Sequence, residues 1–360
     1  MKICLLTGNL GKGGIGRVYL NLAQAFLESG ICVDIYMIRP TNERTALLPG
    51  GVNLVYGRGS HRNGIYALTK YVNKEKPDLL ISPRAHTNLL AIFLKLLKGN
   101  KLKVFLTFHT NQHQDEQRKW AWVNKYIIRF ADSLIAVSDG VARQIEQDWN
   151  LKRGIVKTIY NPIWDANFEK YKYDDVKHPW FDEKEKASRP IVISVGRLTK
   201  AKNYELLVRA FALLNKKIDS RLIILGDGEE REKLVSLINH LGLQNLIDLP
   251  GNVNNPLAYM SKANLFVLSS SWEGLPTVLV EALGVGLPVV STDCPFGPAE
   301  ILENGKYGSL VSVDNEHELA DAMYTKLISV TDPFAQNKRA HDFSFQNSAE
   351  KYLSLFNHAS

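Results

Sequence analysis

The sequence predicts an α/β protein built from two doubly wound parallel-sheet domains. The chain has 360 residues, of which 45% are apolar and 22% charged, so it is longer than one ordinary domain and can form two cores. Short apolar runs of strand length alternate with longer helical patterns, which indicates parallel sheets covered by helices. The alternation stops once in the middle of the chain and then restarts, which indicates two such domains.

The first domain is expected over residues 1–165. Apolar runs of strand length recur along it, and helical stretches such as residues 18–29 separate them. The predicted strands are residues 2–7, 32–38, 52–56, 78–82, 103–109 and 132–138.

A polar, aromatic-rich stretch at 166–190 has no clean periodicity and is interpreted as a linker. The second domain is expected over 190–342, with strands at 191–196, 221–228, 265–270 and 287–292 and helices at 204–215, 231–242 and after Pro276. The segment 343–360 is expected to belong to the first domain, because residues 343–358 have the pattern of one amphipathic helix that crosses back to it. Ligands of open α/β sheets bind at the carboxyl ends of the strands, so the functional residues are expected there, in a cleft between the domains.

The charge is distributed unevenly along the chain. Residues 1–165 contain 23 Lys and Arg against 12 Asp and Glu, whereas the remaining residues contain 21 against 25. This asymmetry indicates that the first domain meets an anionic partner. Nucleic acid is excluded as that partner, because no nucleic-acid-binding module is recognisable and the basic residues are spread out.

A membrane surface is the other anionic partner considered. Lys119 and Trp120 lie in a stretch, 118–126, where cations and aromatic rings interleave; it fits a membrane interface, and it equally fits a helix that buries its tryptophans. No apolar run reaches the length of a transmembrane helix, and the three cysteines show no metal or disulfide spacing. The protein is therefore expected in the cytoplasm, with a peripheral contact to the inner leaflet.

Gly11, Gly13 and Gly16 form a G-x-G-x-x-G pattern after the first strand. A nicotinamide site would also need an acidic residue at the end of the second strand, and that strand ends at Arg39 instead. A glycine-rich loop at a helix N-terminus still offers backbone N–H groups to an anion, so Gly13 and Gly14 are candidates to approach a diphosphate, with Arg17 one turn further on. A turn without a ligand is the alternative.

The tract 269–300 combines a strand end, a tight loop and a helix start. Glu273 lies in the loop, Pro276 suits the first turn of the helix, and Glu281 follows one to two turns later. Carboxylates accept paired hydrogen bonds from vicinal hydroxyls, so the two glutamates could hold the two ends of a nucleotide-sugar. The alternative is a capping carboxylate and a solvated helix glutamate.

The E-x7-E spacing of Glu273 and Glu281, within EGLPTVLVEAL, resembles the signature of glycosyltransferase family 4. GRLTKAKN at 196–203 is similar to the family's G-R-L-x-x-x-K-N, and LGDGEERE at 225–232, LPGNV at 249–253 and GGIGR at 13–17 fit their expected places. The resemblance covers nearly the whole chain. It implies the two-domain GT-B fold and a transferase that retains anomeric configuration.

The resemblance also implies roles for individual residues. Glu273 would hold the reacting sugar, Glu281 the ribose, and Arg197 and Lys202 the diphosphate, where a departing phosphate needs cationic stabilisation. His109, at the end of the fifth strand, would bond the donor sugar near its reacting carbon. The catalytic candidates are His109, Arg197, Lys202 and Glu273. The donor-binding candidates are Gly13, Gly14, Asn252, Val253, Gly274, Leu275, Pro276, Thr277 and Glu281. The acceptor-side candidates are Arg17, Lys119 and Trp120.

No metal or other cofactor is expected, because the sequence has no DxD motif and enzymes of this fold generally need none. The absence of an evident carboxylate nucleophile suggests front-side attack, in which the departing phosphate oxygen takes the acceptor proton. The DCPFGPAEIL ending at 293–302 is similar to enzymes that extend lipid-linked or lipopolysaccharide oligosaccharides from UDP-hexose or UDP-N-acetylhexosamine. A nucleotide-sugar epimerase of the same fold and a noncatalytic nucleotide-sugar-binding protein remain as alternatives.

Overall fold

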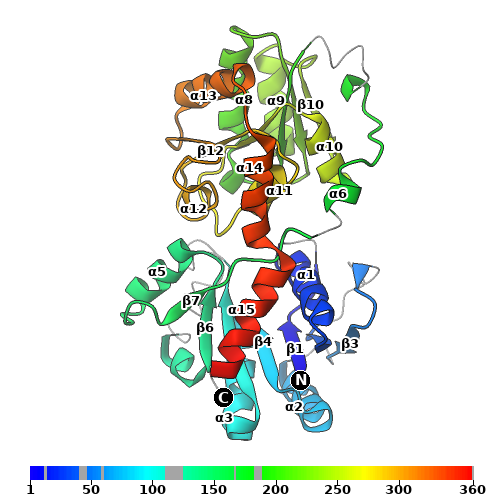
Figure 1. Ribbon diagram of the computed structural model, residues 1–360, viewed down its shortest axis with the longest axis vertical. Helices are drawn as coiled ribbons and strands as arrows, with labels where there is room; N and C mark the ends of the chain where they lie inside the picture. Colours follow the sequence, from blue (N-terminus) through cyan, green and yellow to red (C-terminus); the bar gives the residue numbers. More distant parts are fainter. Residues whose placement is uncertain are drawn as a thin grey trace. The chain divides into compact units, whose positions relative to one another are not determined.

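A computed structural model describes residues 1–11, 14–39, 47–57, 61–109, 125–165, 168–181 and 189–358. The chain divides into two compact units, the first made of Met1–Ile163 with Phe343–Ser360 and the second of Trp164–Asp342. Each unit contains one parallel sheet with helices on its faces (Figure 1). The two units are described separately.

The sheet of the first unit has seven parallel strands in the order β3-β2-β1-β4-β5-β6-β7. The strands are β1 Lys2–Thr7, β2 Cys32–Met37, β3 Asn53–Tyr56, β4 Leu79–Ser82, β5 Lys103–Phe108, β6 Ser133–Ala136 and β7 Val156–Thr158. Six of them match the predicted strands. The seventh was missed because only Val156 of its three residues is buried, so the sequence carries no apolar run there.

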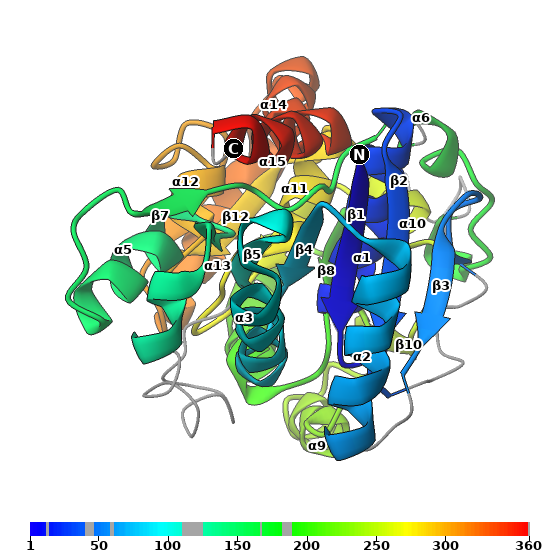
Figure 2. The ribbon, with the colours of Figure 1, turned by 90° about the horizontal axis from the view of Figure 1, so that it is seen from below.

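Five helices of the first unit, among the residues that the structure describes, are α1 Gly14–Glu28, α2 His61–Glu75, α3 Ala85–Lys98, α5 Asp139–Asp148 and α15 Phe345–His358. Helices α1 and α15 lie side by side over one face of the sheet (Figure 1 and Figure 2). The Phe26 and Tyr352 rings meet edge to face with centroids 5.8 Å apart. The prediction that the C-terminal helix returns to the first domain is confirmed.

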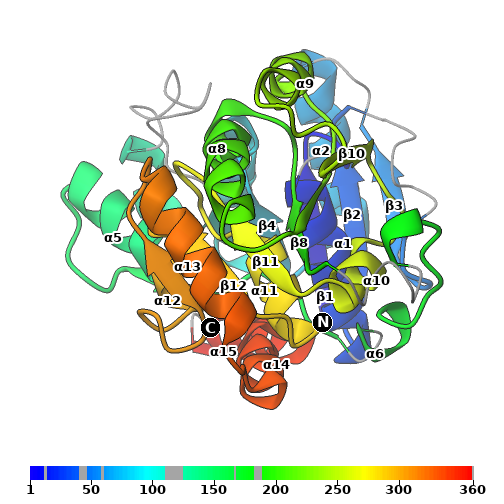
Figure 3. The ribbon, with the colours of Figure 1, turned by 90° about the horizontal axis from the view of Figure 1, so that it is seen from above.

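The sheet of the second unit has six parallel strands in the order β10-β9-β8-β11-β12-β13 (Figure 3). They are β8 Ile191–Val195, β9 Arg221–Leu225, β10 Ile247–Gly251, β11 Leu265–Leu268, β12 Val289–Thr292 and β13 Ser309–Val311. The four predicted strands are present, and β10 and β13 are additional. Two doubly wound sheets of this kind confirm the predicted fold class.

Helices cover both faces of the second sheet. On one face, α8 Tyr204–Asn215, α9 Arg231–His240 and α13 Glu316–Ile328 enclose the apolar core with side chains from all six strands. Helix α11, Thr277–Gly284, contacts β11 and β12 and also packs against α10, Pro256–Lys262, and α14, Pro333–Ala340. Helix α12, Pro298–Ile301, follows the loop after β12. Because the strands are parallel, the carboxyl ends of β8 to β12 lie along one edge of the sheet.

The predicted linker at 166–190 is folded onto the second unit over the part that the structure describes. Its helix α6, Phe168–Tyr171, ends at Tyr171, whose carbonyl accepts a hydrogen bond of 2.8 Å from Asn255 Nδ2. His178 Nε2 lies 2.9 Å from Asp248 Oδ2, and Arg221 lies over the Trp180 ring. These contacts come from short irregular turns, which explains why the sequence shows no periodicity there.

Candidate functional site

The loop after β8 is fixed by close backbone packing against the loop after β9. Gly226 has a φ of +135°, and a Cβ added there would lie 2.0 Å from the carbonyl oxygen of Gly196. A Cβ on Gly228 would lie 2.3 Å from the carbonyl oxygen of Leu198, which is itself completely buried. Only glycine fits at these two positions. The loop backbone is thus held while the intervening Arg197 side chain points outward.

Arg197 and Lys202 both follow β8, as predicted, but their surroundings differ. The Arg197 side chain is 74% exposed and its guanidinium lies 3.4 Å from Glu229 Oε2. The Lys202 side chain is 19% exposed, and its Nζ lies 2.5 Å from Oε1 of Glu273, which is 13% exposed. Lys202 is therefore part of a half-sheltered ion pair, whereas Arg197 is an open surface cation. The exposed pair of Arg197 and Glu229 contributes little to stability.

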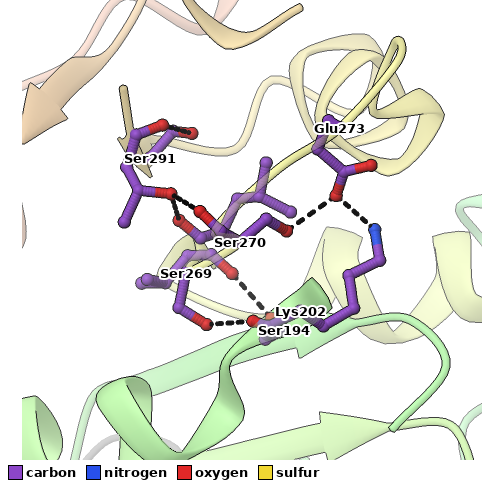
Figure 4. A network of polar contacts seen from close by, with 9 residues as sticks. Ser194, Lys202, Ser269, Ser270, Glu273 and Ser291 are labelled. Carbon is purple, nitrogen blue, oxygen red and sulfur yellow. Dashed lines mark hydrogen bonds and ion pairs between the residues drawn. The ribbon is translucent and has the colours of Figure 1, made fainter. Parts of the chain in front are cut away.

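The Lys202–Glu273 pair connects the loop after β8 with the loop after β11 (Figure 4). Ser270 Oγ donates a hydrogen bond of 2.7 Å to the same Glu273 Oε1, and Ser269 Oγ donates one of 2.9 Å to the Lys202 carbonyl. Thr292 Oγ1, from the end of β12, donates one of 2.6 Å to the Ser270 carbonyl. Three neighbouring strand ends thus fix the position of one carboxylate.

The two oxygens of the Glu273 carboxylate are used unequally. Oε1 receives both Lys202 Nζ and Ser270 Oγ, and Oε2 receives no hydrogen bond from the residues that the structure describes. A carboxylate with one oxygen held in this way keeps the lone pairs of the other for a ligand hydroxyl. Glu273 does not cap α11, because it accepts no hydrogen bond from the first turn of that helix among the bonds found, and its role at the sugar stays a prediction.

Helix α11 begins directly after Pro276, as the sequence indicated, but Pro276 itself lies before the first turn. Pro276 is the residue before the helix, with φ −71° and ψ 93°, and Thr277 is the first helical residue, without a side-chain cap. The loop before it is tight: Gly274, Leu275 and Pro276 are buried, and a Cβ on Gly297 would lie 2.4 Å from Pro276 Cδ. The first N–H groups of a helix have no partner within the helix, so this start can bind an anion or a sugar oxygen.

Glu281 lies on α11, one turn after Thr277, and only 1% of its surface is exposed. The alternative of a solvated helix glutamate is therefore wrong, because bulk water does not reach this side chain. Burial of a carboxylate costs free energy unless polar groups surround it.

Asn252 and Val253 follow β10, where the Gly251 carbonyl accepts a hydrogen bond of 2.8 Å from Gly226 N–H. Asn252 is exposed and Val253 is half-buried.

Sequence reasoning missed Asn203. Its φ of +46° is left-handed, and its Oδ1 accepts a hydrogen bond from Leu206 N–H at the start of α8. Its Nδ2 donates to Ser271 Oγ at 3.2 Å and to Asp314 at 2.7 Å. Asparagine tolerates the left-handed conformation and caps helices, which was the available signal. Asn203 therefore sets where the chain turns after Lys202.

The first unit places His109 at the end of β5. His109 Nε2 lies 3.1 Å from Thr107 Oγ1, and burial, followed by the charge of Arg84, lowers the pKa of His109 to about 4. The imidazole is therefore neutral at neutral pH, and a neutral ring can exchange one hydrogen bond as donor and another as acceptor. His86, on α3, approaches Gly8 from the neighbouring strand end, a group that sequence reasoning also missed.

The glycine-rich loop after β1 packs against the start of α1. A Cβ on Gly16 would lie 2.8 Å from the carbonyl oxygens of Leu10 and Gly11, so glycine is required there. Gly14 is the first residue of the helix, and Arg17 is exposed. Gly13, Lys119 and Trp120 lie outside the described residues, and their predicted roles stay predictions.

Two further properties concern the described residues as a whole. No group of three or more histidine, cysteine, aspartate or glutamate side chains is arranged to hold a metal ion among them. No helix among them is long and apolar enough to cross a membrane.

Comparison with known proteins agrees with this architecture. Residues 12–165 match the family model described as Glycosyltransferase Family 4, and residues 177–337 match that of Glycosyl transferases group 1. The chain is 31% identical over 341 residues to an uncharacterised glycosyltransferase of Haemophilus influenzae, with 89% of each protein covered. The two matching units have the GT-B architecture of glycosyltransferases. The chain belongs to glycosyltransferase family 4.

Two more similarities describe related proteins. The chain is 35% identical over 209 residues to an N-acetylgalactosamine-N,N'-diacetylbacillosaminyl-diphospho-undecaprenol 4-alpha-N-acetylgalactosaminyltransferase of Campylobacter jejuni, and this match spans 57% of the chain and 54% of that relative. The crystal structure of HepE from Anabaena in complex with UDP superposes with a TM-score of 0.81 at 20% identity, covering 99% of this chain and 100% of the other. At this identity the structural likeness establishes the fold alone.

Proposed function

We propose that this protein is a retaining glycosyltransferase that moves a hexose or N-acetylhexosamine from a UDP-sugar to a hydroxyl of a glycan acceptor. The acceptor is a lipid-linked or lipopolysaccharide oligosaccharide used for bacterial surface polysaccharide. The observation that carries the proposal is the Glu273 carboxylate, which Lys202 and Ser270 hold through one oxygen while its other oxygen accepts no hydrogen bond from the described residues. The UDP complex of HepE and the lipid-linked substrate named for the Campylobacter relative support the choice of donor and acceptor.

The chemistry of the second unit follows from its charges. The diphosphate would lie near Lys202 and Arg197 and the start of α11, where cationic and dipolar groups stabilise the charge that develops on the leaving UDP. Glu273 Oε2 would accept hydroxyl groups of the sugar, and Glu281 would contact the ribose. The departing phosphate oxygen would then take the proton of the acceptor hydroxyl, which attacks from the same face. No metal ion is needed in this scheme.

The first unit would contribute the acceptor and one contact to the donor sugar. His109 is neutral at neutral pH, so it would act through a hydrogen bond near the reacting carbon and not as a cation. Gly14 and the start of α1 would approach the diphosphate through backbone N–H groups. Arg17, Lys119 and Trp120 are the acceptor-side candidates.

We also propose that the first unit touches the inner leaflet of the membrane through α3. Phe93, Leu96 and Leu97 on this helix are 44%, 60% and 56% exposed. Lys98 and Lys101 lie beside them, so apolar and cationic groups share the end of the helix. Such a surface buries its apolar side chains at the headgroup boundary while the lysines attract anionic lipid.

The membrane contact is tested by sedimentation with vesicles. The Leu96→Ser, Leu97→Ser double variant should lose binding to anionic vesicles, and the Ile328→Ser, Val330→Ser variant, whose residues in the second unit are at least as exposed, should keep it. Absence of wild-type binding at low ionic strength would contradict the proposal.

The transferase is tested by incubating the purified chain with UDP-, GDP- and ADP-sugars and following sugar release. A transferase hydrolyses its donor slowly without acceptor, so release from UDP-sugars is expected, and Glu273→Gln should abolish it. Conversion of the UDP-sugar to its epimer without acceptor would identify an epimerase instead. Binding without hydrolysis, followed by no transfer to lipid-linked glycan, would identify a binding protein.

A further inference from the structure

A pocket of about 340 Å³ lies in the first unit between β2, β3 and α2, at the edge of the sheet. Figure 2 shows β3 as the outermost strand there, with α2 nearby. Four tyrosines line the pocket, and its volume is within the range of roughly 300–1,000 Å³ typical of small-molecule sites. The tyrosines are Tyr36, Tyr56, Tyr66 and Tyr71.

Two side chains that line the pocket, Tyr71 and Asn53, belong to a hydrogen-bond network around Asp34. Tyr71 donates a hydrogen bond of 2.5 Å to Asp34, and Asn53 Nδ2 donates one of 3.2 Å to the same carboxylate. Asp34 is 2% exposed and lies 3.1 Å from Lys2 Nζ. The Tyr36 and Tyr71 rings are 5.2 Å apart and tilted. The network around Asp34 thus holds Tyr71 and Asn53 in place on one side of the pocket.

One polar group of the pocket lining is left over. Tyr36 is 1% exposed, and its hydroxyl has no hydrogen-bond partner among the described residues. Buried tyrosine hydroxyls normally have a partner, and this one belongs to a side chain that lines the pocket. The oxygen of this hydroxyl has almost no exposed surface, so a ligand hydroxyl that supplies the missing bond has to displace a side chain at the pocket wall. None of the residues assigned to donor binding or transfer lies in this pocket.

The rim offers aromatic faces and a positive charge. Tyr56 and Tyr66 are 50% and 68% exposed. Lys74 is balanced by Glu75 at 3.2 Å, whereas Lys70 makes no ion pair with any residue that the structure describes. The C–H face of a pyranose packs against aromatic rings, and a carboxylate or phosphate on the sugar would meet Lys70.

We propose that this pocket is a carbohydrate subsite that takes one sugar ring with an acidic substituent. The ring stacks on Tyr56 and Tyr66, one hydroxyl bonds to the Tyr36 hydroxyl, and the acidic group lies at Lys70. We assign this sugar to the acceptor glycan, at a distance from its reacting end, and this assignment rests on the proposed function. The binding of the sugar by the pocket does not.

The test is a ligand-observed NMR titration of the full chain with methyl glucuronide and with methyl glucoside. Saturable binding is expected, tighter for the glucuronide. Tyr66→Ala should weaken both by at least about tenfold, and Tyr36→Phe by about 3- to 10-fold, as for one neutral hydrogen bond. Lys70→Gln should remove the preference for the glucuronide.

The control is Tyr19→Phe. Tyr19 is equally buried in the same unit, but its hydroxyl donates a 3.2 Å hydrogen bond to the Ile81 carbonyl. Tyr19→Phe should lower the melting temperature and leave sugar binding unchanged, whereas Tyr36→Phe should keep or raise the melting temperature and weaken binding. The opposite pattern, or equal binding by wild type, Tyr36→Phe and Tyr66→Ala, overturns the proposal, as does the absence of saturable binding.

UDP-sugar hydrolysis, measured on the same samples, separates the two proposals. The pocket variants should hydrolyse at the wild-type rate, because none of them touches the donor site. Hydrolysis without sugar binding would refute the subsite alone. Sugar binding without hydrolysis of any nucleotide-sugar would refute the proposed function alone.

Discussion

The Lys202–Glu273 ion pair can be tested by replacing each partner with a neutral residue of similar shape, as Lys202→Met and Glu273→Gln, singly and together. Nζ and Oε1 are 2.5 Å apart, and the two side chains are 19% and 13% exposed. Exposed pairs contribute about 0–1 kcal/mol, and breaking a fully buried pair costs about 3–5 kcal/mol. The burial of this pair lies between the two, so a coupling free energy of about 1–3 kcal/mol is expected.

The coupling is measured as a double-mutant cycle of urea unfolding of the second unit, followed by tryptophan fluorescence and circular dichroism. The losses of stability of the two single variants should add up to more than the loss of the double variant, because each single variant leaves one charge half-sheltered without its partner. Ser270→Ala serves as the matched control, since it removes a contact of 2.7 Å from the same oxygen without removing a charge. Additive free energies, within about 0.3–0.5 kcal/mol, would refute the reasoning.

The same variants separate a structural role from a functional one. A loss of about 1–3 kcal/mol leaves most of a domain with a typical stability of about 5–15 kcal/mol folded. Loss of one positioned polar group at a reaction centre costs about 10²–10³-fold in rate. Glu273→Gln should therefore reduce UDP-sugar hydrolysis by at least about a hundredfold, to near the limit of detection, while it remains folded. A hydrolysis rate within a few fold of wild type, in a folded variant, would show that the pair only joins two loops.

Three other outcomes are expected. The pKa of His109 is lowered from 6.5 to about 4, so the unfolded chain takes up the proton first as the pH falls, and the stabilising contribution of the neutral ring is complete above about pH 6.5 and lost toward pH 4. His109→Gln should therefore flatten the dependence of the free energy of unfolding in urea on pH between these values. An unchanged dependence on pH would contradict the burial. Gly226→Ala places a Cβ 2.0 Å from a carbonyl oxygen and should destabilise the second unit by more than about 3 kcal/mol, whereas Gly242→Ala, with φ +67° and nothing within 4 Å, should cost only about 1–2 kcal/mol in the same unfolding assay; equal costs would argue against the loop packing. EDTA should leave UDP-sugar hydrolysis unchanged, since Lys202 and Arg197 are expected to hold the diphosphate; a loss restored by Mg²⁺ would refute this.

The sheets were predictable because their central strands are continuous apolar runs. Residues 2–7 and 191–195 are buried from end to end or nearly so, and their sequences contain little else than apolar residues. β7 and β13 were not predictable, because a three-residue strand at a sheet edge needs only one buried side chain. The segment 168–181 was interpreted as a linker because it has no local pattern. The contacts that hold its aromatic residues are made with residues far away in the sequence.

The candidate site was predictable as a set of residues but not as a network. The spacing of Glu273 and Glu281 suggested two similar carboxylates, whereas the structure makes Glu273 part of an ion pair and buries Glu281. Burial depends on the neighbouring helices and strands, which a local pattern does not contain. The position of Pro276 before the first turn of α11 was not predictable, because the fixed φ of proline is compatible both with a helix and with the residue that precedes one.

The pairing of Lys202 with Glu273 has a consequence for the order of events at the site. In the described structure Lys202 is used to hold a carboxylate, and its charge is already balanced. A diphosphate carries more negative charge than a carboxylate and offers more acceptor oxygens, so it competes for Lys202 and weakens the pair. Glu273 would then keep Ser270 as its partner and gain hydroxyl groups of the donor sugar in place of the lysine. Nucleotide and sugar would thus bind together, because the diphosphate takes Lys202 out of the ion pair and the sugar hydroxyls take the place of Lys202 at Glu273.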